Sequence, residues 1–167
     1  MENIGQTIVY QRKVCQVNDL IKNYRNDEDY YVLSPLYDKS LVMYVPATLF
    51  NKQARPIITK QAVEKLIDQI PDIEKVEIDE KLLEATYRDL FKTEKHEDLI
   101  RIIKTTYLRN ENKVKRGLKT GEKDKTYFRL AENALYNEPA IVLDKTPEDT
   151  KKYVLDRVQA FSDEVDA

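Results

Sequence analysis

The sequence of 167 residues has no tryptophan, one cysteine, one histidine and three glycines. A single cysteine, Cys15, excludes an internal disulfide framework and fits a reducing compartment. Three glycines cannot supply a glycine-rich phosphate loop. One histidine, His96, and one distant cysteine give no metal-ligand spacing. We therefore expect neither a metal nor a cofactor.

Long apolar runs are also missing. No run is long enough to span a bilayer, and the N-terminus lacks the apolar core of a signal peptide. We expect a cytoplasmic protein without membrane contact, and most simply a monomer.

Candidate nucleophiles are few. Cys15 lies in a strand pattern, where a buried cysteine is far more common than one activated by a distant histidine. The three serines lack the sequence context of a nucleophile elbow. The composition therefore favours a protein that is not an enzyme. A small enzyme that uses Cys15 remains an alternative, and thiol alkylation would test it.

Charge of both signs is abundant and unevenly distributed. The chain is 35% charged with a net charge of −2, yet residues 104–129 hold nine Lys or Arg against three Asp or Glu. Residues 64–84 have the opposite balance, with three basic and eight acidic residues. Such asymmetry predicts two differently charged faces, although solvated helix faces would give the same pattern. The densest positive segment, here called the basic corner, consists of Lys113, Lys115, Arg116, Lys119, Lys123, Lys125 and Arg129.

The first fifty residues have the pattern of short strands rich in Val, Tyr and Leu. The expected strands are 6–10, 13–21, 30–37 and 40–46, separated by turn residues. Four close strands suit a small antiparallel sheet of SH3 or Tudor type. We expect this module to span residues 1–52, with Pro46 ending its last strand.

A helical period begins after a linker at residues 53–58. Five helices are expected in residues 59–167, with Thr59, Asp79, Thr120 and Thr146 as caps and Tyr107 and Leu130 among the inward side chains. The fold class is therefore α+β: a β module followed by a bundle of about five helices.

Several ordered motifs resemble the CarD family of bacterial RNA polymerase-binding regulators. The C-terminal set is Arg116-Gly117-Leu118, Gly121-Glu122-Lys123, Ala131, Leu135, Glu138 and Ala140. The N-terminal set is IGQTIVY (4–10), YYVL (30–33) and YVP (44–46). Together the two sets extend over roughly residues 4–143.

The resemblance implies a transcription regulator. Its N-terminal Tudor-like module would dock on the RNA polymerase β subunit, and its helical domain would contact promoter DNA and shift the open-complex equilibrium. The implied polymerase-binding residues are Val42, Met43, Tyr44, Val45 and Pro46. The implied DNA-binding residues are those of the basic corner, through phosphate contacts without sequence readout.

The sequence departs from the family pattern at the tryptophan that wedges into the DNA minor groove. In this sequence that position falls near Asp79 or Glu80, which are acidic. We therefore expect phosphate contacts alone to attach the helical domain to DNA. The alternative is an adaptor of polymerase, or of another factor, that binds protein only. The missing tryptophan and the acidic segment 64–84 favour that alternative.

Overall fold

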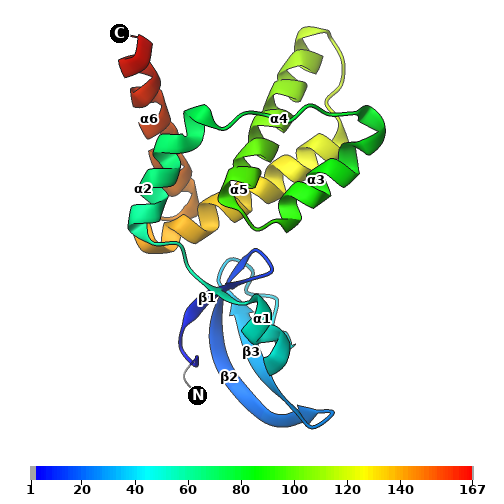
Figure 1. Ribbon diagram of the computed structural model, residues 1–167, viewed down its shortest axis with the longest axis vertical. Helices are drawn as coiled ribbons and strands as arrows, with labels where there is room; N and C mark the ends of the chain where they lie inside the picture. Colours follow the sequence, from blue (N-terminus) through cyan, green and yellow to red (C-terminus); the bar gives the residue numbers. More distant parts are fainter. Residues whose placement is uncertain (1–2, 167) are drawn as a thin grey trace. The chain divides into compact units, whose positions relative to one another are not determined.

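The computed structural model describes the backbone of residues 3–166 and the side chains of residues 3–159. The chain divides into two compact units, Met1–Ile58 and Thr59–Ala167. The first contains an antiparallel sheet and the second is helical, which confirms the α+β class (Figure 1). Each unit is described separately below.

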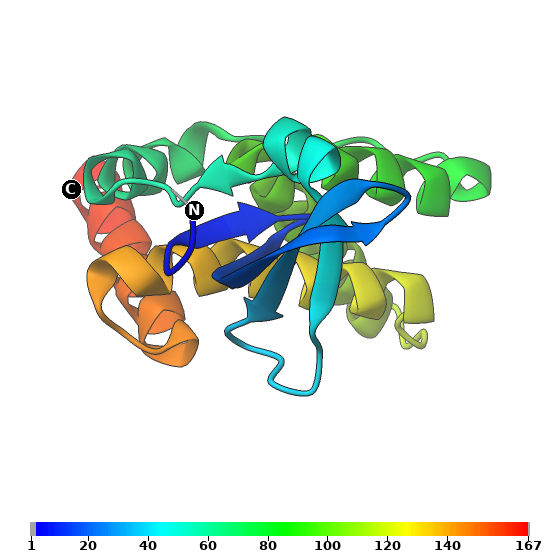
Figure 2. The same ribbon diagram turned by 90° about the horizontal axis from the view of Figure 1, so that it is seen from below.

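Residues 3–58, the described part of the β unit, contain five antiparallel strands in the order β4-β3-β2-β1-β5. Their bounds are β1 Thr7–Tyr10, β2 Lys13–Arg25, β3 Glu28–Pro35, β4 Met43–Pro46 and β5 Arg55–Pro56. Strands β2 and β3 form a long hairpin, seen in Figures 1 and 2. Its turn uses Asn26 and Asp27, both at positive φ, as a two-residue hairpin loop requires.

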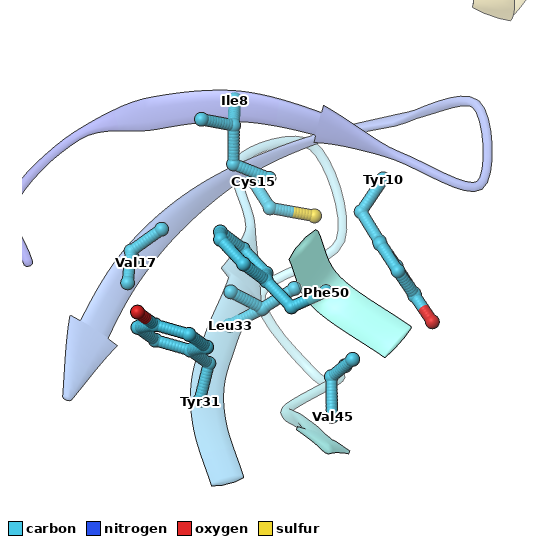
Figure 3. Close-up of a cluster of buried hydrophobic side chains, with 8 residues drawn as sticks. All are labelled: Ile8, Tyr10, Cys15, Val17, Tyr31, Leu33, Val45 and Phe50. Carbon is cyan, nitrogen blue, oxygen red and sulfur yellow. The ribbon is translucent and has the colours of Figure 1, made fainter. Parts of the chain in front are cut away.

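One face of this sheet carries the core of the unit. The ring centroids of Tyr31 and Phe50 lie 4.2 Å apart, and Cys15 is fully buried in the same cluster. Figure 3 shows these side chains. Burying such large side chains supplies most of the stability of a unit this small. The cluster consists of Ile8, Tyr10, Cys15, Val17, Tyr31, Leu33, Val45 and Phe50.

Two elements of the β unit were not expected from the sequence. Helix α1 (Ala47–Gln53) follows β4 directly and packs against β3 and β4. Residues 53–58, expected as a linker, contain strand β5, which pairs with β1. Phe50 explains α1, because its burial in the core holds this short helix in place.

Over its described residues, 59–166, the helical unit contains five α-helices and two 3₁₀ turns. Their bounds are α2 Lys60–Gln69, η1 Ile70–Asp72, η2 Glu80–Leu82, α3 Leu83–Lys92, α4 His96–Lys115, α5 Glu122–Leu143 and α6 Pro147–Asp166. Helix α5 packs against both α4 and α6 (Figure 1). The core includes Tyr87, Leu99 and Ile102, all fully buried.

Three of the four expected caps are confirmed. Thr59 accepts a hydrogen bond from the Ala62 amide, and Thr146 accepts one from the Asp149 amide. Asp79 caps η2, the turn that leads into α3. The fourth expectation is wrong, because Gly121 and not Thr120 occupies the N-cap of α5.

The prediction that Tyr107 and Leu130 face the core is also wrong. Both side chains are exposed. In α4 the inward positions next to Tyr107 are taken by Thr105 and Thr106, which are buried. Thr106 donates its hydroxyl to the carbonyl of Ile102, so burying this polar residue leaves no unmet donor. Among the described residues, no helix combines the length and the apolar character that a membrane span requires.

Candidate functional site

The first candidate site is the outer edge of the sheet. Strand β4 ends the strand order and, among the described residues, pairs only with β3. Its pairs run from Leu33 opposite Met43 to Tyr30 opposite Pro46. The other side of β4 therefore presents unpaired backbone groups, which a strand from another protein can join.

The residues expected to bind polymerase divide between two faces. Val45 is buried in the core and Met43 packs against it, so neither offers its side chain to a partner. Tyr44 is 51% exposed and Val42 is 48% exposed. Pro46 is half-buried at the end of the strand. Only Val42, Tyr44 and Pro46 can thus contribute side chains at this edge.

Tyr44 belongs to a group of three tyrosines, here called the tyrosine cluster. Tyr24 lies nearly parallel to Tyr44, with centroids 5.5 Å apart, and 5.1 Å from Tyr30. The three residues come from β2, β3 and β4. Tyr24 and Tyr44 are exposed, and Tyr30 is half-buried. Aromatic side chains held by one another lose little entropy on binding, which makes the cluster a strong candidate for protein contact.

The second candidate site is the basic corner, where α4 ends and α5 begins. Lys113 and Lys115 lie in the last turn of α4, and Lys123 lies in the first turn of α5. Arg116 and Lys119 occupy the connection between the helices. Cations at a helix C-terminus also stabilise the helix dipole, so this placement has a structural role of its own.

A structural requirement explains the glycine at each of the two positions of the corner. Gly117 has a φ of +70° and follows the end of α4 in the left-handed conformation, as its sequence position predicts. Its neighbour Leu118 donates its amide to the carbonyl of Lys113 at 2.8 Å, which closes the helix end. A Cβ atom at Gly121 would lie 3.3 Å from Asp124 Oδ2 and 3.4 Å from Lys113 Nζ. Gly121 therefore leaves room for that pair of charges.

Carboxylates neutralise part of the corner. Four of its seven cations lie within 4 Å of an acidic oxygen. The pairs are Lys113–Asp124 (3.8 Å), Lys115–Glu111 (3.4 Å), Lys123–Glu84 (3.1 Å) and Lys125–Glu122 (3.7 Å). Apart from the first, these pairs are exposed to solvent and contribute little to stability.

The remaining three cations differ from these four. Arg116, Lys119 and Arg129 are exposed, and within the described side chains they have no ion pair. They are the members of the corner that are immediately available to an anion.

A buried charge network lies behind the corner. Asp124 is fully buried and accepts hydrogen bonds from the Tyr87 hydroxyl at 2.6 Å and from Arg109 Nε at 3.2 Å. Arg109 also donates through its two terminal nitrogens to Glu80, at 2.7 and 3.2 Å. The network ties α3, α4, α5 and η2 together, and the buried carboxylate keeps cationic partners, as burial requires.

The pKa directions agree with this geometry. The hydrogen bond from Arg109 lowers the pKa of Glu80, and the hydrogen bond to Glu80 raises that of Arg109. Burial, together with the hydrogen bond to Asp124, raises the pKa of Tyr87. Arg109 and Glu80 are therefore both charged at neutral pH.

From the sequence, these network residues were not predicted to belong to a site. Arg109 precedes Lys113 by four residues and so shares its helix face, which was an available signal. The acidic segment was noticed, but its contacts with Arg109 and Lys123 were not expected. The contacts of Tyr24 with Tyr30 and Tyr44 were not predicted either, because they depend on the register in which β2, β3 and β4 pair.

The residues first considered for chemistry have structural roles. Cys15 is fully buried, and burial raises the pKa of its thiol to about 11, so it is a poor nucleophile. His96 Nε2 lies 3.1 Å from Oε1 of the buried Glu138. Within the described part of the chain, no group of three His, Cys, Asp or Glu residues is arranged to hold a metal ion.

No protein-family model matches the sequence, and no curated protein matches it.

Proposed function

We propose that this protein is a transcription regulator that binds the RNA polymerase β subunit through its β unit. In this proposal the helical unit contacts promoter DNA without sequence readout and changes the stability of the open complex. The proposal starts from the ordered CarD-like motifs. The observation that carries it is the unpaired outer edge of β4, with Val42 and Tyr44 exposed beside it.

A strand edge binds a partner strand through main-chain hydrogen bonds. Those bonds give affinity but little selectivity, so neighbouring side chains must supply the rest. Here Tyr44 stands at the edge and is held by Tyr24, and aromatic residues of this kind dominate the binding energy of many protein interfaces. Pro46 and the short length of β4 limit random edge pairing.

Contact with DNA is supported by the unpaired cations of the basic corner. Arg116, Lys119 and Arg129 can neutralise phosphates and release counter-ions. Three such contacts give weak binding by themselves. Attachment to polymerase raises the effective concentration of the helical unit at the promoter and compensates for this weakness.

Polymerase binding is tested with the full chain and purified bacterial core polymerase. Tyr44→Glu should weaken binding by about tenfold or more, because it removes an aromatic contact and places a charge at the edge. Val42→Glu should act in the same direction. Affinity can be measured by biolayer interferometry with immobilised polymerase.

The control is Tyr107→Glu, which replaces an exposed tyrosine of the helical unit. It should leave polymerase affinity unchanged. If the wild-type chain does not bind core polymerase, the proposed function is wrong. If all three variants bind like the wild type, a different surface makes the contact.

The second candidate function is an adaptor that binds protein only. The ion pairs of Lys113, Lys115, Lys123 and Lys125 favour it, because they leave a smaller free positive charge than the sequence suggests. A fork-junction promoter DNA separates the two functions. The regulator shifts this DNA in a salt-dependent way with polymerase present, whereas the adaptor leaves the polymerase–DNA affinity unchanged.

A further inference from the structure

Two acidic side chains lie against the basic surface of the helical unit. Glu80 contacts Arg109 through two hydrogen bonds of 2.7 and 3.2 Å. Glu84 contacts Lys123, with 3.1 Å between Oε2 and Nζ. Both acids come from the segment of η2 and the first turn of α3. We call these two residues the acidic cover.

The contact between Glu80 and Arg109 has the geometry of anion recognition. A guanidinium group offers a planar fork of N–H donors, which fits a carboxylate and a phosphate equally well. The inner side of this fork is already fixed, because Arg109 Nε donates to the buried Asp124. Its terminal nitrogens are thereby aimed at Glu80 as an anion site with a set direction.

The two sides of this contact differ in exposure. The Arg109 side chain is 18% exposed, whereas the Glu80 side chain is 70% exposed. Glu84 and Lys123 are both about half exposed. The cation of the first pair is thus held by the protein, and its acid is surrounded by water. The exposed pair of Glu84 and Lys123 adds little net stability. Glu80 already borders water, so its carboxylate can move into solvent when another anion takes its place on Arg109.

The covered cations lie near the free ones along the chain. Lys123 lies in the first turn of α5, four residues after Lys119. Arg109 lies on α4 seven residues, or about two helical turns, before Arg116. Removing the cover would therefore add the oriented guanidinium group of Arg109 to the basic corner and free the ammonium group of Lys123, which already belongs to it. The enlarged surface would hold more phosphates of a nucleic-acid backbone.

We propose that Glu80 and Glu84 occupy phosphate positions on this surface and are displaced when the helical unit binds DNA. The acidic cover then keeps the free protein from binding DNA non-specifically. Binding becomes strong enough only where a tether holds the DNA close. This inference rests on the DNA contact of the proposed function and adds Arg109 to the contact residues.

The test compares full-length variants with altered acids. Glu80→Gln combined with Glu84→Gln keeps the size of both side chains and removes their charges. Binding to a fluorescein-labelled fork-junction duplex is measured by anisotropy over a range of salt concentrations. With two more cations available, we expect about tenfold tighter binding at low salt. The slope of log affinity against log salt should steepen by about 1.8.

The matched control is Asp68→Asn combined with Glu148→Gln. It changes the net charge equally, and Asp68 is also an exposed, paired acid, on Arg157 in the helical unit. The control should bind DNA like the wild type. Equal tightening in both double variants, or none in either, overturns the acidic cover while leaving the DNA contact intact.

Two further outcomes separate the cover from the proposed function. Binding by the double variant but not by the free wild type supports the cover. Absence of binding by every variant at low salt contradicts both the cover and the DNA contact. If the double variant does not fold, Glu84→Gln alone suffices, because Glu84 pairs with Lys123 and takes no part in the network around Arg109. It should then tighten binding by about threefold.

Discussion

The hydroxyl of Tyr87 donates a 2.6 Å hydrogen bond to Oδ1 of Asp124, and both side chains are fully buried. These residues are 37 positions apart in the sequence. Their contact joins α3 to the start of α5, and Arg109 completes it from α4. The connection between α4 and α5, which carries the basic corner, is therefore anchored to a buried charge.

Removing the buried carboxylate should destabilise the helical unit strongly. Asp124→Ala removes the buried acceptor of the Tyr87 hydroxyl and of Arg109 Nε and should lower the free energy of unfolding by roughly 3–5 kcal/mol, because both donors lose their buried partner. Tyr87→Phe removes one hydrogen bond and should cost about 1–2 kcal/mol. Urea unfolding followed by circular dichroism measures both. The control is the exposed ion pair between Asp68 and Arg157. Asp68→Asn should lower the free energy of unfolding by less than about 1 kcal/mol. Equal effects at Asp124 and Asp68 would contradict the importance of burial.

Gly117 should tolerate asparagine better than alanine. Its φ of +70° is strained for a residue with a Cβ atom, and asparagine adopts this conformation more readily than most. Gly117→Ala should cost about 1 kcal/mol in thermal unfolding, and Gly117→Asn clearly less. No atom lies within 4 Å of a Cβ placed there, so crowding cannot confuse the comparison.

Stability of the β unit should fall in alkaline solution through Cys15. Burial raises the pKa of this thiol from 9.0 to about 11. Above about pH 9 the unfolded chain loses the proton while the folded chain keeps it. The stabilisation is therefore complete below pH 9 and is lost as the pH approaches 11, by about 2 kcal/mol. Urea unfolding of the wild type and of Cys15→Ala, near pH 9 and near pH 11, measures this loss of stability. A loss of the same size in Cys15→Ala would show that other groups cause it.

The unpaired cations should dominate contact with DNA. Replacing Arg116, Lys119 and Arg129 with Glu should reduce the salt slope of binding to fork-junction DNA by about 2–3, since three phosphate contacts disappear. Anisotropy in the presence of polymerase reports this slope. The control replaces Lys65, Lys92 and Lys152, which are exposed cations on other helices. If the control loses as much affinity, only net charge matters and the basic corner is not a site.

Local signals in the sequence predicted much of the fold. The change from alternating to helical periodicity located the two units. Thr59 and Thr146 identified the starts of α2 and α6, because their hydroxyls bond to amides only three residues away. Helix α1 and strand β5 had no such signal. Their formation depends on Phe50 entering the core and on pairing with β1, which are contacts between distant parts of the chain.

The sequence by itself determined the composition, the α+β class and the existence of a basic segment around Gly117. Only the tertiary structure decided which of those cations are free. Glu80 and Arg109 are 29 residues apart, and no local pattern predicts that their side chains meet. An ion pair depends on distances of a few ångströms, and packing between helices sets those distances. The same reason applies to the tyrosine cluster, where strand register brings three separate tyrosines together.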